Sequence, residues 1–110
     1  ALKRTGEANA IMDKAIKLPS ATMQSIHQYG RALLAAGQNQ KALEVFQYNF
    51  KTHPNEKFTT YVGLARGYAA NGNKKEAIKH WELAIKNIPE NQKPNQALYE
   101  AEVKKLKEGQ

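Results

Sequence analysis

The sequence contains two matching stretches, YGRALLAAGQNQKALEVFQYNFKTHP at residues 29–54 and LARGYAANGNKKEAIKHWELAIKNIP at residues 64–89. Each residue of the first stretch lies 35 positions before its counterpart in the second. The coinciding positions are mainly small, aromatic or turn-forming. They are Arg31 and Arg66, Ala35 and Ala70, Gly37 and Gly72, Ala42 and Ala77, Leu43 and Ile78, Phe46 and Trp81, Lys51 and Lys86, and Pro54 and Pro89. A period of this length is typical of folds that stack one supersecondary unit.

Each repeat predicts two helices joined by a turn. In the second repeat, apolar residues recur at a spacing of three or four between residues 61 and 68, which indicates one amphipathic helix. Gly72 supplies the positive φ that commonly ends a helix. Asn73, with Glu76 three residues on, predicts a capping box at the start of the next helix. That helix ends by Pro89, which disfavours helix at the residue before it.

These spacings resemble the tetratricopeptide repeat (TPR), a unit of about 34 residues with the pattern W-x₂-L-G-x₂-Y, then A-x₃-F, then P. The matching residues are Gly30, Ala42, Phe46 and Pro54 in the first repeat, and Leu64, Tyr68, Ala77, Trp81, Ala84 and Pro89 in the second. The departures are Ile26 and Leu33 for family aromatics, Tyr61 for Trp and Ala65 for Gly. The resemblance covers residues 23–91. It implies an all-α fold, a TPR-like α-solenoid of antiparallel helix pairs with about six helices.

The two ends extend this plan, so that residues 1–110 are expected to form a single TPR-like helical domain. Residues 5–18 predict the orphan second helix of a partial repeat, with Ile11 at the position of Phe46. A helix that buries one face normally needs a neighbour on both sides of a solenoid, so we expect the chain to be a piece of a longer protein. The complete repeats occupy residues 23–56 and 58–91.

A capping helix is expected at residues 94–108, with Pro94 in its first turn. Its predicted apolar stripe consists of Leu98, Tyr99, Val103 and Leu106. Such a helix covers the apolar face that the last repeat would otherwise expose.

The net charge of +7 is spread along the whole chain. Residues 1–57 carry eight basic and four acidic side chains, and residues 58–110 carry nine and six. Lysines that stand singly or in pairs among acids are typical of a solvated helix face, so no nucleic-acid partner is expected. A basic module that binds an anionic polymer is a weaker alternative. No apolar run approaches the roughly 18 residues of a membrane helix, so no membrane span is expected.

The sequence favours a protein that is not an enzyme and that binds no metal or cofactor. The absence of cysteine excludes disulfides and thiolate metal sites. His27, His53 and His80 are isolated in sequence, and none has a second histidine at helical metal-binding spacing. No glycine-rich stretch follows a predicted strand, and no nucleophile lies beside a base in a recognisable arrangement.

The TPR resemblance implies a binding groove built by the first helix of each repeat. Its residues would be Gln24, His27, Gln28, Arg31 and Leu34, with Thr59, Val62, Gly63, Arg66 and Ala69 at the matching positions. We select Gln24, His27, Gln28, Arg31, Thr59, Val62 and Arg66 as the peptide-binding set. Arg31 and Arg66 recur in register and could bind an acidic side chain or a C-terminal carboxylate. Alternatively, both arginines pair with neighbouring acids or lie in solvent.

A narrower resemblance concerns residues 29–91, whose phrases ALEVFQYNFKTHP and YVGLARGY are similar to the helical C-terminal region of secreted bacterial proteins with an uncharacterised β-rich domain ahead of it. It implies a soluble periplasmic or secreted protein and leaves the localisation otherwise unknown. The leading hypothesis is a non-catalytic protein-interaction module that binds a protein or peptide on the concave face of stacked helix pairs, with an acidic partner as one candidate. The alternative is an auxiliary helical domain that packs in cis against a catalytic or ligand-binding domain of a longer protein. The oligomeric state is not predicted.

Overall fold

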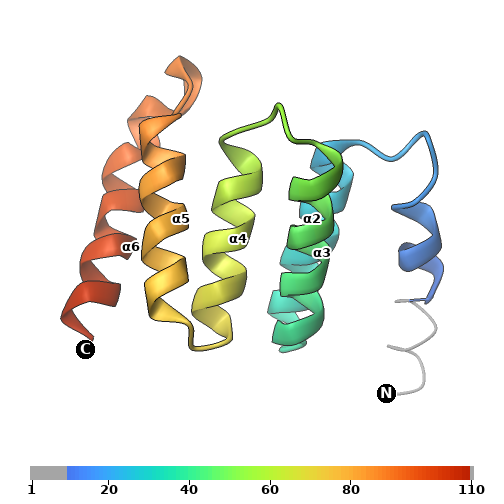
Figure 1. The fold of residues 1–110 in the computed structure, drawn as a ribbon, viewed down its shortest axis with the longest axis horizontal. Helices are drawn as coiled ribbons and strands as arrows, with labels where there is room; N and C mark the ends of the chain where they lie inside the picture. The colour runs from blue at the N-terminus through green and yellow to red at the C-terminus, as the bar shows by residue number, and fades with distance from the viewer. Residues whose placement is uncertain (1–9, 110) are drawn as a thin grey trace.

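A computed structural model describes residues 10–109, which form helices and connecting turns without any β-strand in that range (Figure 1). The predicted all-α class is therefore confirmed. Residues 10–15 are helical. The further elements are α2 (Met23–Ala35), α3 (Asn39–Thr52), α4 (Thr59–Ala70), α5 (Lys74–Lys86), the 3₁₀ helix η1 (Glu90–Asn95) and α6 (Gln96–Glu108).

The helices stand side by side, from the blue N-terminal segment at one end of the molecule to the red α6 at the other (Figure 1). From α2 to α6, each α-helix contacts the next one along the chain, and α2 also contacts α4. The first helices of the two repeats are therefore direct neighbours. This contact decides which side chains can share a surface.

The turns that connect the two helices of each repeat depend on glycine. Gly37 has φ of 79° and Gly72 has φ of 80°, a conformation that other residues adopt only with strain. After the second turn, Asn73 caps α5 by accepting a hydrogen bond from the Glu76 amide at 3.3 Å. The return bond of a capping box is absent, because the Asn73 amide donates to the Tyr68 carbonyl instead. The predicted cap is confirmed, and the predicted box is wrong.

The core consists of two clusters, each containing the buried aromatic residue of one repeat. Phe46, 1% exposed, lies in the first cluster, and Trp81, 2% exposed, lies in the second. Ala42 and Ala77 are both fully buried, as expected where helices approach closely. These two pairs of equivalent positions in the 35-residue repeat are thus buried alike.

The N-terminal segment differs from the prediction. Ile11, expected at a core position, is 68% exposed, whereas Ile16 is buried in the Phe46 cluster. The reason is that the segment contacts the following helices through Met12, Asp13 and Ile16, which lie on another side of the helix from Ile11. Of the predicted helix over residues 5–18, residues 5–9 lie outside the described range, and the helix there ends at residue 15.

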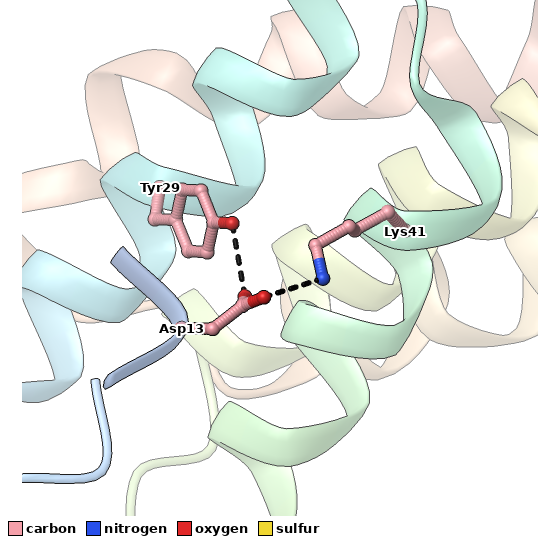
Figure 2. Close-up of polar contacts among 3 residues, drawn as sticks. All are labelled: Asp13, Tyr29 and Lys41. Carbon is pink, nitrogen blue, oxygen red and sulfur yellow. Dashed lines mark hydrogen bonds and ion pairs between the residues drawn. The ribbon is translucent and has the colours of Figure 1, made fainter. Parts of the chain in front are cut away.

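A polar contact fixes the N-terminal segment on the first repeat (Figure 2). The two carboxylate oxygens of Asp13 accept hydrogen bonds from the Tyr29 hydroxyl at 3.0 Å and from Lys41 Nζ at 2.9 Å. Burial alone would raise the pKa of Asp13, but these two bonds and the charge of Lys41 outweigh it and hold that pKa below its ordinary value. The segment is therefore bound to both α2 and α3.

The C-terminal region also corrects two details. Pro94 lies inside η1, and the α-helix predicted over residues 94–108 begins only at Gln96. Leu98, expected in the apolar stripe, is 65% exposed. Tyr99, Val103 and Leu106 pack against the Trp81 cluster at spacings of four and three. Leu98 lies one residue, or about 100°, out of that phase, which places it in solvent.

Candidate functional site

A single pocket of about 170 Å³ contains every residue of the predicted peptide-binding set. We call it the α2–α4 pocket. Its lining consists of Gln24, His27, Gln28 and Arg31 from α2, Thr59, Val62 and Arg66 from α4, and Phe58, Gln92 and Tyr99. None of these ten residues is acidic.

Helical geometry explains why the seven predicted residues meet. The α2 members lie at relative positions 0, 3, 4 and 7, and the α4 members at 0, 3 and 7, so each set forms one stripe along its helix. The contact between α2 and α4 then places the two stripes opposite each other. The repeat period brings Arg31 and Arg66 to equivalent places on the two helices.

The remaining positions of the inferred groove do not line this pocket. Leu34 and Ala69 line a neighbouring pocket of about 270 Å³, which Arg66 also lines. Gly63 belongs to the core instead, where its Cα faces the ring of Phe46. Arg66 therefore stands between two hollows on the surface.

His27 forms part of the pocket wall and is 6% exposed. Its Nδ1 atom is buried and has no hydrogen-bond partner within residues 10–109. Burial lowers its pKa most, the charges of Arg31 and Arg66 lower it further, and Glu56 partly opposes them, with a resulting pKa of about 4. His27 is therefore neutral at pH 7, although a carboxylate stands nearby.

Arg66 is held in place by a contact with the second core cluster. Its Cζ lies 5.4 Å from the centroid of the Trp81 ring, a cation–π contact that fixes the guanidinium against the second core cluster. Its Nε is buried and has no hydrogen-bond partner among residues 10–109. Burial and the charge of Arg31 lower its pKa, and Tyr99 and Glu102 oppose that effect. An arginine nevertheless stays protonated at neutral pH.

Neither arginine forms an ion pair with an acidic side chain of the described chain, where the ion pairs involve only lysines. Arg31 is exposed, and Arg66 is half-buried. Of the two alternatives drawn from the sequence, pairing with neighbouring acids is thus not realised. The pocket presents two cations that a negatively charged group can reach.

Sequence reasoning missed Phe58, Gln92 and Tyr99. Tyr99 stacks on Trp81 with ring centroids 5.4 Å apart, and its edge meets Phe58 at 5.7 Å. It was expected only to cover the last repeat, and it also closes one side of the pocket. The TPR resemblance assigns the groove to the first helices alone. It therefore gives no signal for Phe58, which precedes α4, or for Gln92 and Tyr99 from the C-terminal elements.

Comparison with protein-family models, with curated proteins and with solved structures found no match to this chain. Within the part of the chain that the structure describes, no group of three or more histidine and acidic side chains could hold a metal ion. None of the described helices has both the length and the apolar character to cross a membrane. The α2–α4 pocket is therefore the candidate functional site.

Proposed function

We propose that the chain is a TPR-like solenoid of helix pairs that binds an acidic peptide segment of a partner protein in the α2–α4 pocket, without catalysing a reaction. One observation carries the proposal. Seven residues selected from the sequence as a peptide-binding set line one pocket, and the two arginines among them have no acidic partner in the described chain.

The contacts between helices support the TPR-like part of the proposal. Within each repeat the two helices contact each other, and the first helices of the repeats are neighbours. The aromatic residue of the A-x₃-F pattern is buried in both repeats, as Phe46 and as Trp81. This is the packing expected when one unit is stacked on its copy.

The chemistry of the pocket supports an acidic ligand. Guanidinium groups bind carboxylates through paired, charge-assisted hydrogen bonds, which are stronger than neutral ones. Arg66 Nε is a buried donor without a partner in the described part of the chain. Leaving such a donor unpaired has a free-energy cost that a bound acceptor would remove. Gln24, Gln28 and Thr59 supply further polar groups at the rim.

The size of the pocket favours a peptide over a whole small molecule. Its volume of about 170 Å³ is below the roughly 300–1,000 Å³ of sites that enclose a drug-sized ligand. It suits a single carboxylate-bearing side chain or a chain terminus, with the rest of the peptide lying across α2 and α4.

The test uses a fluorescent octapeptide of glutamate and alanine with a free C-terminal carboxylate, titrated with the protein and followed by anisotropy. The double variant Arg31→Ala, Arg66→Ala should weaken binding at least tenfold. The matched control Lys79→Ala, Lys104→Ala removes the same charge from exposed sites outside the pocket and should change binding only slightly. If the two double variants weakened binding equally, net charge alone would account for the interaction, and the proposed role of the pocket would be wrong. Unchanged binding by the arginine variant would reject the proposal.

A further inference from the structure

His27 is the histidine that lines the α2–α4 pocket. Resting on the function proposed above, we propose that His27 takes up a proton when an acidic peptide segment occupies the pocket, so that the pocket binds acidic ligands more tightly as the pH falls below neutral. His27 is then the residue through which the site responds to the charge of the ligand.

Charged and aromatic side chains from several elements surround His27. Arg31 on its own helix and Arg66 on α4 are the cations that act on it, and Glu56, between α3 and α4, is the anion. From α3, the ring of Phe46 lies against it with centroids 5.5 Å apart. Gln92 and Tyr99 face the same pocket from η1 and α6.

The geometry leaves His27 with an unused polar atom at the wall of a cationic pocket. Its Nδ1 atom is buried and unpartnered in the described structure, so neither protonation state is fixed by a hydrogen bond there. The histidine therefore responds mainly to burial and to the charges around it. Those charges are two cations and one carboxylate, and the balance disfavours a third positive charge.

An acidic ligand reverses this balance. A carboxylate bound between Arg31 and Arg66 offsets the two charges that oppose protonation and adds a negative charge beside the imidazole. An opposite charge within about 4–6 Å typically raises a histidine pKa by about one to three. Because linkage is reciprocal, a ligand that promotes protonation is bound more tightly when protons are abundant. The expected result is an affinity that rises as the pH falls.

The other two histidines provide internal controls, because neither lines the pocket. His80 Nδ1 lies 2.7 Å from the Glu76 carbonyl, and its ring stacks on Tyr68. His53 Nδ1 lies 3.1 Å from Thr52 Oγ1 and 3.3 Å from the Asn49 carbonyl. Proton uptake linked to the pocket should therefore come from His27 alone.

The experiment follows the same glutamate–alanine octapeptide between pH 7.5 and 5.5, a range in which its carboxylates stay mainly ionised. We expect the dissociation constant of the native protein to fall about threefold to fivefold over this range. His27→Gln should bind with a nearly constant affinity, while His53→Gln and His80→Gln should retain the change. NMR titration of the imidazole signals, with and without peptide, measures the protonation of His27 in the native protein and does not depend on any variant.

The outcomes separate this inference from the proposed function. Peptide binding that depends on the arginines but not on pH, with His27 unprotonated in the complex at pH 5.5, would overturn the role of His27 and leave the function intact. Absence of peptide binding at every pH would overturn both. A pH dependence that persists in His27→Gln, or that disappears in His80→Gln, would assign the proton to another group and reject the inference.

Discussion

Phe46 fits into the core because glycines make room for its ring. A Cβ atom added at Gly63 would lie 2.5 Å from Phe46 Cδ1, and one added at Gly30 would meet the same ring. Phe46 is 1% exposed, so its ring cannot swing into solvent to relieve the clash. At these two positions the backbone approaches the aromatic ring too closely for any side chain.

Gly63→Ala should therefore destabilise the protein, although the same change in an exposed helix stabilises it by about 1 kcal/mol. We expect a net loss of about 1–3 kcal/mol, as for other overpacked cores. Urea unfolding measures it. In a double-mutant cycle with Phe46→Leu, the double variant should lose less free energy of unfolding than the sum of the two single variants, because the smaller residue removes the clash. A variant Gly63→Ala that is more stable than the native protein would contradict this packing.

His27 should make folding stability depend on pH. Its pKa is about 4 in the folded protein against 6.5 as an ordinary value, so between these pH values the unfolded chain binds more protons. Its contribution to stability is complete above pH 6.5 and is lost as the pH falls. From pH 7 to pH 5 we expect a loss of about 2 kcal/mol in the free energy of unfolding.

Denaturant titrations at pH 7 and pH 5 check this, with His27→Gln as the comparison. Asp13 and Glu56 have lowered pKa values and so lose their own contributions only at more acidic pH. These two carboxylates therefore do not account for a loss of stability between pH 7 and pH 5. An equal loss in the native protein and in His27→Gln would show that another group titrates.

At the scale of the helix, α4 begins without a side-chain cap from its own N-cap residue, Phe58. Glu56 supplies the cap: its Oε1 accepts from the Phe58 and Thr60 amides, each at 3.0 Å. Burial would raise the pKa of Glu56, but the bonds from backbone amides outweigh it and keep the carboxylate ionised. A negative charge at this position also offsets the helix dipole.

Glu56→Ala should cost about 1–2 kcal/mol, the usual range for loss of an N-cap. Glu56→Gln keeps an oxygen acceptor and should cost less than half as much. Thermal unfolding at pH 7 measures both. Hydrogen exchange should locate the loss in the first turn of α4. Equal costs for the two variants would indicate that the charge, and not the acceptor geometry, caps the helix.

The sequence predicts the helices and most of the pocket because both follow from helical spacing and the repeat period. Arg31 and Arg66 occupy equivalent positions, so the contact between α2 and α4 brings their stripes together. Helical spacing does not decide which residue is buried where two apolar residues are adjacent. Leu98 and Tyr99 both suit an apolar stripe, and only packing on Trp81 selects Tyr99. Ile11 and Met12 present the same choice at the other end, where contacts with α2 and α3 decide it.

At the scale of the whole molecule, α4 joins the two cores. Leu64 belongs to the Phe46 cluster, Val62 and Ala65 belong to the Trp81 cluster, and Tyr61 packs against both. Thr59, Val62 and Arg66 of the same helix line the α2–α4 pocket, so Val62 belongs to both the Trp81 cluster and the pocket. Loss of packing in the second cluster should therefore affect binding only through residues that also line the pocket.

Tyr99 and Val103 on α6 provide the comparison that tests this separation. Both pack in the Trp81 cluster, but only Tyr99 lines the pocket. Each replacement by alanine should lower stability by about 1–3 kcal/mol, since each removes partly or fully buried apolar surface. Tyr99→Ala should also weaken binding of the acidic octapeptide severalfold and expose Trp81 to acrylamide, whereas Val103→Ala should bind normally. If both variants lost binding in proportion to stability, α6 would support the fold alone and contribute nothing directly to the pocket.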